Sequence, residues 1–314
     1  MKNWGWTKHR NSRDLPTEET SEQPPSTNNA ARTLALLQSA NYRPADDDVD
    51  FLKRSDTRGL RLQLDYLKAE LLMEQQGVKH TIVVYGGTRI CEPIVAEQQL
   101  EDLLRREKAA PDTPSLQADI AAARAILKKS TYYEMARELG KIIGSNGGQP
   151  DSCELTLMTG GGPGIMEAAN RGAFDVGAKS AGLNISLPRE QYPNPYISEE
   201  LCFSFHYFAI RKLHFILRAK ALVVFPGGFG TIDELFGALT LVQTRSIAPL
   251  PIVLVGEAYW KKVFNIDFLI EEGVISPEDR DLFCFAETAE AIWQAIQHWH
   301  GPGGHHYPGA LTRD

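Results

Sequence analysis

Short apolar runs alternate with longer segments of helical periodicity from His80 to about His298. Nearly continuous apolar runs are typical of strands that are covered on both faces, and helical segments between them supply that cover. The pattern predicts an α/β fold, a doubly wound Rossmann-like parallel sheet with helices on both faces. The predicted strands are Thr81–Tyr85, Leu155–Met158, Ala181–Ile185, Ala221–Phe225, Ile252–Val255 and Leu282–Phe285, and the helices between them include Tyr132–Ile143, Ile165–Val176, Phe208–Ala219 and Ile232–Val242.

The chain outside this pattern divides into three further parts. Residues 1–50 form an N-terminal extension whose stretch from 11 to 50 is rich in Ser, Thr, Asn, Pro and acids, so we expect most of it to be loosely held. Residues 51–79 form a helix, because leucines recur at helical spacing and a glycine follows at the expected C-cap. We expect this helix to pack on the domain or on a partner subunit. The leucines are Leu60, Leu64, Leu67 and Leu71, and the glycine is Gly77.

Within the domain at 80–298, residues 96–129 are predicted to be a helical insert in the first crossover, broken near Pro111 and Pro114. Residues 299–314 are rich in Gly, Pro and His and are predicted to be a flexible tail.

Charge and cysteine content narrow the class of protein. The formal net charge of −7 argues against broad binding to nucleic acid, which needs a basic face. None of the four cysteines stands in a CxxC pair, which favours reduced thiols. No secretory signal is visible, and no apolar run approaches the roughly 20 residues that span a bilayer. We therefore expect a cytoplasmic protein. The cysteines are Cys91, Cys153, Cys202 and Cys284.

Three of the predicted strands end in glycine-rich turns, where open parallel sheets bind their ligands. The first is followed by Gly86-Gly87, and the second by T-G-G-G-P-G-I-M-E from Thr159 to Glu167. Glycines let the backbone approach an oxygen-rich group closely, and the next helix begins with unpaired N–H groups. A tight strand-to-helix turn without a ligand is the alternative for the second exit.

The exit of the fourth predicted strand, P-G-G-F-G-T-I-D-E from Pro226 to Glu234, is the most specific motif. Its glycines free the backbone to wrap an anion, and Thr231 is placed to cap the helix or to bind a phosphate. Asp233 and Glu234 are expected in the first helical turn, where the macrodipole alone explains acidic residues. The functional interpretation is that Glu234 reaches the sugar of a nucleotide whose phosphate the loop holds.

A basic pair, Arg211-Lys212, opens the helix before this strand, with Lys220 near its far end. A solvated helix surface explains such a pair. The alternative is that Arg211 projects into the same crevice, where a guanidinium complements phosphate or a departing base.

Taken together, these motifs resemble those of the LOG (LONELY GUY) family, once labelled "lysine decarboxylase-like", over residues 80–285. The family hallmark P-G-G-x-G-T-x-x-E is complete in Pro226 to Glu234, a glycine cluster followed by G-[IL]-M is present at Gly160 to Met166, and an R-K pair precedes the hallmark. The resemblance implies hydrolysis of the N-glycosidic bond of a purine nucleoside 5′-monophosphate, without metal or cofactor. It also implies a homodimer or higher homo-oligomer.

The resemblance implies catalytic and substrate-binding roles for the residues of this chain that match the family's motifs. Arg211 and Glu234 resemble the catalytic pair. The plant members that activate cytokinins carry M-H-x-R-K, but this chain has Phe208-Ala209-Ile210 before the basic pair. That difference, together with the insert and the extension, leaves the preferred base open. The positions that resemble substrate-binding residues are Gly87, Thr88, Gly161, Gly162, Met166, Glu190, Lys212, Gly227, Gly228, Phe229, Gly230, Thr231 and Thr240.

Other functions remain as alternatives or are set aside. The same fold and loops suit a non-catalytic carrier of a nucleotide or nucleotide-like cofactor, since fold alone does not specify function. A dinucleotide-dependent oxidoreductase is less favoured, because no G-x-G-x-x-G with an acid at the right distance is present. An amino-acid decarboxylase needs a recognisable pyridoxal lysine, and none is apparent. A metal site is not expected at His298, His300, His305 and His306, which lack ligand spacing.

Overall fold

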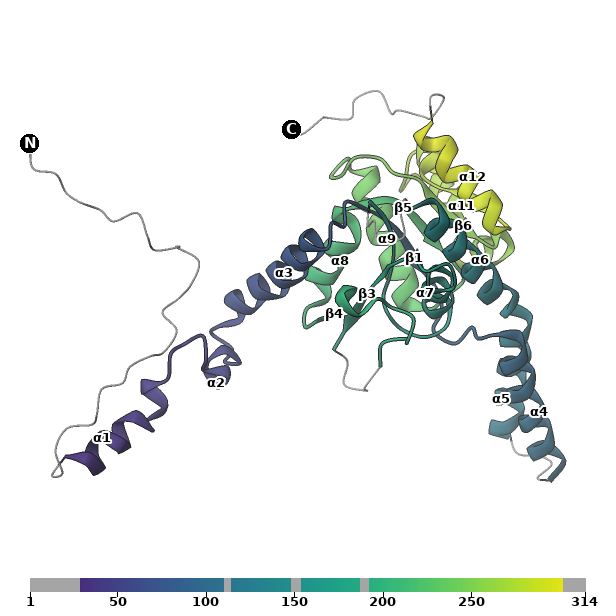
Figure 1. Ribbon diagram of the computed structural model, residues 1–314. Helices are drawn as coiled ribbons and strands as arrows, with labels where there is room; N and C mark the ends of the chain where they lie inside the picture. Colours follow the sequence, from purple (N-terminus) through teal and green to yellow (C-terminus); the bar gives the residue numbers. More distant parts are fainter. Residues whose placement is uncertain (1–28, 110–113, 148–153, 187–191, 302–314) are drawn as a thin grey trace, which may run out of the picture. The chain divides into compact units, whose positions relative to one another are not determined.

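The computed structural model describes residues 29–109, 114–147, 154–186 and 192–301 (Figure 1). The chain divides into two compact units, one up to Leu60 and one from Arg61 onward. The helix α3 (Arg58–Gln75) begins in the first unit and continues into the second. The first unit covers much of the stretch expected to be loosely held, and its short helices have no buried residue. These helices are α1 (Ala30–Leu37), η1 (Ala40–Tyr42) and α2 (Val49–Leu52).

The second unit is built on a parallel sheet of seven strands within the described part of the chain. The strand order is β4-β3-β2-β1-β5-β6-β7, so the chain builds outward from β1 on one side and then returns to its other side. This confirms the predicted doubly wound α/β fold. The strands are β1 (His80–Tyr85), β2 (Leu155–Thr159), β3 (Ser180–Ile185), β4 (Cys202–Phe205), β5 (Ala219–Val224), β6 (Ile252–Val255) and β7 (Cys284–Ala286).

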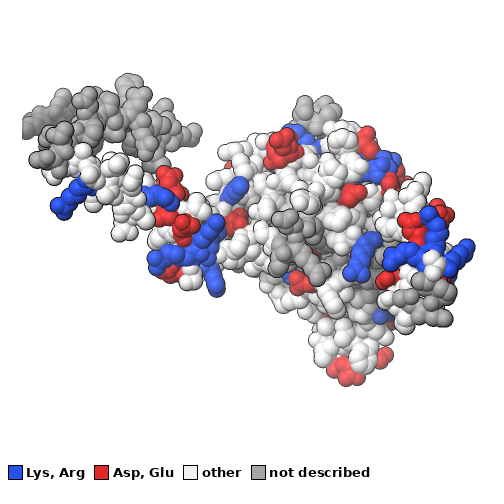
Figure 2. Space-filling model, turned by 90° about the horizontal axis from the view of Figure 1, so that it is seen from below, with Lys and Arg blue, Asp and Glu red and all other residues white. Residues whose placement is uncertain are grey.

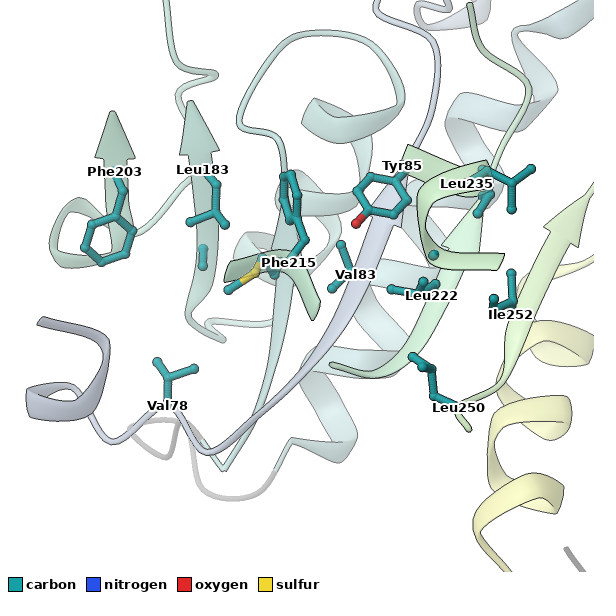
Figure 3. Packing of buried hydrophobic residues seen from close by; sticks show 14 of the residues in the cluster. Val78, Val83, Tyr85, Leu183, Phe203, Phe215, Leu222, Leu235, Leu250 and Ile252 are labelled. Atoms are coloured by element: carbon teal, nitrogen blue, oxygen red, sulfur yellow. The ribbon is translucent and has the colours of Figure 1, made fainter. Parts of the chain in front are cut away.

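Alternate side chains of the strands enter two separate hydrophobic cores. In β1, Ile82 and Val84 face one core, while Val83 and Tyr85 face the other. The first core is closed by α6 (Thr131–Asn146), α7 (Ile165–Asp175) and α12 (Ala289–His300). The second is closed by α3, α8 (Phe208–Leu217), α9 (Phe229–Gln243) and α10 (Glu257–Val263), and Figure 3 shows Tyr85 in it beside Phe215 and Leu235.

Further helices connect these layers. Two long ones, α4 (Pro93–Ala109) and α5 (Pro114–Lys129), lie in the chain between β1 and α6 (Figure 1). None of the helices in the described ranges is long and apolar enough to cross a membrane. The remaining elements are η2 (Glu199–Leu201), α11 (Ile266–Glu271) and η3 (Pro277–Leu282).

Some predicted elements were wrong in detail. The edge strand β4 was not predicted, because its four residues C-F-S-F alternate between exposed and buried positions and contain no apolar run. The helix before β5 ends at Leu217, so Lys220 lies in the strand and not near the end of that helix. The last strand begins at Cys284, because Leu282 still belongs to η3.

Charged side chains of both signs are interspersed on the face drawn in Figure 2. Basic groups there lie beside acidic ones, and the net charge of the whole sequence is −7. This surface differs from the continuous basic footprint that non-specific nucleic-acid binding requires.

The helix α3 is attached to the second unit by Ala69, Met73 and polar residues more than by Leu64 and Leu71. Ala69 and Met73 are buried, but Leu64 and Leu71 are 48% and 50% exposed. Arg218 donates two hydrogen bonds to Glu70, at 2.8 and 2.6 Å, and a third to the carbonyl of Val78. This bidentate pair is mostly shielded from solvent, so its two partners depend on each other.

We expect Glu70→Ala to lower the free energy of unfolding by about 2 kcal/mol, because Arg218 would lose its counter-charge in a partly buried position. Chemical denaturation of the two proteins measures the difference. Glu257→Ala is the matched control, since Glu257 pairs with Lys261 on an exposed helix surface. Such a pair contributes less than about 1 kcal/mol. Equal losses in the two variants would contradict a structural role for the Glu70–Arg218 pair.

Candidate functional site

The three glycine-rich exits meet at the centre of the sheet. Strands β2, β1 and β5 are neighbours, and their ends are joined by backbone hydrogen bonds. The amide of Gly87 donates to the carbonyl of Pro226 at 2.9 Å, and the amide of Ile165 donates to the carbonyl of Gly87 at 3.2 Å. The loops therefore form one surface at the point where the chain reverses its winding, which is where open α/β sheets bind ligands.

The loop after β2 requires glycine where it touches the loop after β1. Gly164 has φ of 76°, and a Cβ atom there would collide with the carbonyl oxygen of Gly87. The left-handed conformation and the close approach both exclude a side chain. This contact fixes the start of α7 against the first strand exit.

The loop after β5 leads directly into α9. Gly228 is the N-cap residue and has no side-chain cap, so the first amides of the helix have no helical acceptor. A Cβ atom on Gly227 would collide with the side chain of Thr231, which is 7% exposed. The prediction that Thr231 sits at the N-cap was wrong, because the helix starts three residues earlier than predicted, at Phe229. Tyr259 donates a hydrogen bond of 2.5 Å to the carbonyl of Gly227 and holds this turn in place.

The early start of α9 also changes the interpretation of its two acids. Asp233 and Glu234 lie beyond the first turn, which contains no acidic residue. The macrodipole is strongest at the first turn, so it does not explain them. The side chain of Asp233 is 61% exposed, whereas that of Glu234 is 9% exposed. A carboxylate placed in the interior requires partners, and Glu234 has them on α8.

Arg211 and Glu234 form a shielded ion pair between α8 and α9. The Nη2 of Arg211 lies 3.5 Å from the Oε1 of Glu234, at the limit of hydrogen-bond distance. The arginine side chain is 14% exposed, and its guanidinium carbon lies 5.3 and 5.5 Å from the ring centroids of Phe208 and Phe215. Sequence periodicity alone allowed a solvated surface, and the structure contradicts this for Arg211.

Burial acts on both charges of this pair. Loss of hydration raises the pKa of the Glu234 carboxyl, although Lys212 and Arg211 act in the opposite direction. Loss of hydration also lowers the pKa of the Arg211 guanidinium against the effect of Glu234. The Nε of Arg211 is buried and has no hydrogen-bond partner in the described part of the chain. The guanidinium of this pair thus keeps one N–H group that is free to bind a ligand, which is typical of a ligand site.

The loop after β2 reaches the same pair. A Cβ atom on Gly160 would lie 4.0 Å from the Nη1 of Arg211 and 2.9 Å from the sulfur of Met166. The side chain of Lys212 is partly exposed, and its Nζ is 2.8 Å from Asp233 Oδ2 and 3.9 Å from Glu234 Oε2. The structure therefore brings together Met166, Lys212 and the predicted catalytic pair.

A pocket of about 370 Å³ lies between the loops after β1 and β5. Neither Arg211 nor Glu234 lines it, so it is a separate part of the same loop surface. Its wall consists of Gly87, Thr88, Arg89, Ile90, Ile126, Lys129, Pro226, Gly227, Gly228 and Tyr259.

Comparison with known proteins agrees with these motifs. The sequence profile of the family described as "Possible lysine decarboxylase" matches residues 166–296. The cytokinin riboside 5′-monophosphate phosphoribohydrolase LOG3 of Arabidopsis thaliana is 28% identical over 177 residues, which cover 55% of this chain and 77% of the relative. LOG1 of the same plant, which has the same enzyme name, is 28% identical over 174 residues, covering 54% of this chain and 76% of the relative.

These matches support the LOG family for this chain. Among solved structures, the Moco carrier protein from Chlamydomonas reinhardtii is 20% identical, with 70% of this chain and 96% of that chain covered and a TM-score of 0.38. A second structure of the molybdenum cofactor carrier protein from that organism has 21% identity, a TM-score of 0.39, and 70% and 97% coverage. Likenesses at this score support no conclusion about function.

A buried amide network holds the loop after β2, and sequence reasoning missed it. Asn194 Nδ2 donates to the carbonyls of Gly161 and Gly162 at 3.2 and 3.1 Å and to Asn170 Oδ1 at 3.0 Å. Asn170 also accepts a hydrogen bond of 2.7 Å from the hydroxyl of Thr159. The N-P dipeptide at Asn194 was the available signal, because asparagine before proline is typical of a turn. These bonds occupy the glycine carbonyls.

The other predicted residues are less closely connected. Phe229 is 92% exposed at the start of α9. Thr240 lies on an exposed part of that helix, and its hydroxyl donates to the carbonyl of Phe236 at 2.8 Å. Glu190 lies outside the described residues. Ala209 follows Phe208 at the start of α8, where the plant members that activate cytokinins carry histidine.

Proposed function

We propose that this protein acts as a LOG family enzyme and hydrolyses the N-glycosidic bond of a purine nucleoside 5′-monophosphate to the free base and ribose 5-phosphate. The observation that carries the proposal is the shielded Arg211–Glu234 pair, which lies beside glycine loops and the uncapped start of α9. A carboxylate and a guanidinium in this setting match the charges that develop when a ribose–base bond breaks.

In the proposed reaction, the bond between ribose C1′ and the base nitrogen breaks, and the electron pair leaves with the base. The oxygen of water bonds to C1′, and the base gains one proton overall. The sugar develops oxocarbenium character, which a nearby carboxylate stabilises, as in glycoside hydrolysis generally. Glu234 has this role, or it holds the ribose hydroxyls.

Arg211 supplies electrostatic stabilisation. A guanidinium stays charged and is a poor proton donor, so it acts through its charge and its N–H groups. The amides at the start of α9 are suited to a phosphate, because the N-terminus of a helix favours anions. Holding the phosphate positions the bond for attack and contributes binding energy at a distance from the reacting atoms.

The test is to incubate the protein with a panel of nucleoside 5′-monophosphates, including AMP and cytokinin ribotides, and to measure free base and ribose 5-phosphate. Release of both in equal amounts supports the proposal, and the panel identifies the preferred base. Tight binding of monophosphates without release would favour a non-catalytic carrier instead.

The pH dependence of base release tests the ionisation of Glu234. If the carboxylate is required, the rate falls as the pH drops through its pKa, which burial raises above that of an ordinary glutamate. Lys212 lowers this pKa through its positive charge. We therefore expect Lys212→Met to move the acid limb of the kcat profile to higher pH. Lys261→Met, on an exposed surface pair, is the control. A limb that stays in place or moves down in Lys212→Met would contradict this assignment.

A further inference from the structure

The helix α8 carries Arg211, and the helix α3 holds α8 at both of its ends. At the far end, Arg218 forms the bidentate pair with Glu70. At the start, the carboxylate of Asp65 accepts hydrogen bonds from the two backbone amides that directly precede the first helical residue. Because α3 precedes the first strand and all of the motifs on which the proposed function rests, those motifs give no sign of its part in the site.

Asp65 is placed to fix the backbone at the start of α8. Its two carboxylate oxygens lie 3.1 and 3.0 Å from the amide nitrogen of His206, and Oδ2 lies 2.9 Å from that of Tyr207. The side chain is half-buried, and within the described residues all of its hydrogen bonds go to backbone amides. Tyr207 is the N-cap residue and has no side-chain cap, so the start of α8 is held from another helix. A carboxylate there also suits the positive end of the helix dipole.

The hydrogen bonds of Asp65 are directly connected to the backbone of Arg211. The amide of Arg211 donates to the carbonyl of Tyr207 at 3.1 Å. Tyr207 is therefore held by Asp65 through its amide and holds Arg211 through its carbonyl. A shift of Tyr207 would move the guanidinium, whose Nη2 lies 3.5 Å from Glu234 Oε1. This distance is at the limit for a hydrogen bond, so a small outward shift separates the pair.

We propose that Asp65 is a positioning residue, which holds the first turn of α8 so that Arg211 stays beside Glu234. This rests on the proposed function, in which the two charges act together at the ribose–base bond. Asp65 acts through the backbone of Tyr207 and not by contact with the substrate. Misplacement of a catalytic group by about 1 Å costs up to about a hundredfold in rate. The helix α3 is then part of the catalytic architecture and not only an N-terminal appendage.

A purely structural role for Asp65 has a different signature. A residue that only attaches α3 lowers activity through the fraction of folded protein. Glu70 is the comparison, since it attaches the same two helices but bonds Arg218 and not the backbone next to Arg211. Asp48 is the matched control, because its carboxylate accepts a hydrogen bond from a backbone amide at the start of α2, in the first unit.

The experiment uses the full chain and the variants Asp65→Ala, Asp65→Asn, Glu70→Ala and Asp48→Ala. Steady-state kinetics with AMP measure kcat and KM, and thermal unfolding measures stability. We expect Asp65→Ala to lower kcat about tenfold or more with little change in KM, because the displaced charge acts in the transition state. Asp65→Asn keeps one acceptor oxygen and should lose less. Glu70→Ala should lower the unfolding midpoint with a smaller loss of kcat, and Asp48→Ala should change neither constant.

The decisive measurement is the effect of Asp65→Ala in a chain that also carries Arg211→Ala. If Asp65 acts by placing Arg211, its substitution changes kcat little once the guanidinium is absent, because residues that act as a unit lose activity non-additively. A loss of the same size in both backgrounds would overturn the inference, since general loosening of the fold does not depend on Arg211. An unchanged kcat for Asp65→Ala in the chain with Arg211 would overturn it as well.

Amide hydrogen exchange gives a readout that does not need turnover. We expect the amides in the first turn of α8 to exchange faster in Asp65→Ala than in Asp48→Ala or the unaltered chain, because that turn loses the acceptor that holds it. Equal exchange in the three proteins would contradict the inference. If Asp65→Ala does not fold, the same kinetic and exchange measurements on Asp65→Asn decide the question.

The outcomes separate this inference from the proposed function. If base is released and the losses of Asp65→Ala and Arg211→Ala are additive, the inference is overturned and the proposed function stands. If the unaltered chain releases no base, the proposed function fails, and faster exchange in Asp65→Ala still supports the hold of Asp65 on the turn that carries Arg211.

Discussion

Glu234→Gln is expected to lower kcat for release of base from a nucleoside monophosphate by about two orders of magnitude or more, as for a single positioned catalytic group. The substitution keeps the size of the side chain but removes the negative charge. In the role of stabilising the cation that develops at ribose C1′, the negative charge is what the side chain supplies. The effect of this charge is large because the side chain of Glu234 is only 9% exposed, so water screens the charge weakly.

The matched control is Asp233→Asn, which removes a charge one residue away. Asp233 is exposed and pairs with Lys212 at 2.8 Å, so we expect its loss to change kcat by no more than a few-fold. Titration with AMP should show that Glu234→Gln still binds nucleotide. Similar kcat losses in the two variants, or an unchanged rate in Glu234→Gln, would exclude Glu234 as the catalytic carboxylate.

A second substrate separates the two roles left open for Glu234. If the carboxylate holds the ribose 2′-hydroxyl, Glu234→Gln should cost much less with dAMP than with AMP, because that contact is already missing. If it stabilises the cation or orients water, the loss should be similar with both substrates.

Arg211→Ala is expected to lower kcat by about two to three orders of magnitude, the size of effect seen when a preorganised electrostatic group is removed. The substitution removes the charge that we propose acts at the reacting centre, and it leaves Glu234 in the interior with only the more distant Lys212 as a partner on α8. The pKa of Glu234, which burial already raises, should then rise further, and less of the carboxylate should be ionised at neutral pH.

A double-mutant cycle tests whether the pair acts as a unit. We expect Arg211→Ala combined with Glu234→Gln to be little slower than the worse single variant, because residues that act together lose activity non-additively. Arg211→Lys should restore little, since a single ammonium does not reproduce the planar guanidinium between Phe208 and Phe215. Strictly additive losses in kcat would show instead that the two residues contribute independently.

Six of the seven strands of the described sheet, the doubly wound fold and the glycine-rich exits were predicted from the sequence alone. Each depends on a local signal: an apolar run for a covered strand, a helical period for its crossover, or glycines where backbone must turn sharply. The hallmark from Pro226 to Glu234 and the basic pair on the preceding helix were found in the same way. Elements with weak local signals were missed, and β4 is one, because four alternating residues do not differ enough from a loop.

The tertiary structure decided how these parts are used. Asp233 and Glu234 are adjacent and chemically similar in sequence, yet one is exposed and the other is buried against Arg211. The start of α9 at Phe229 excluded the N-cap role of Thr231, and α5 brought Lys129 to a loop more than ninety residues away, beside Gly227 and Gly228. Burial and partners depend on contacts between elements that are distant in the chain, and local periodicity carries no information about such contacts.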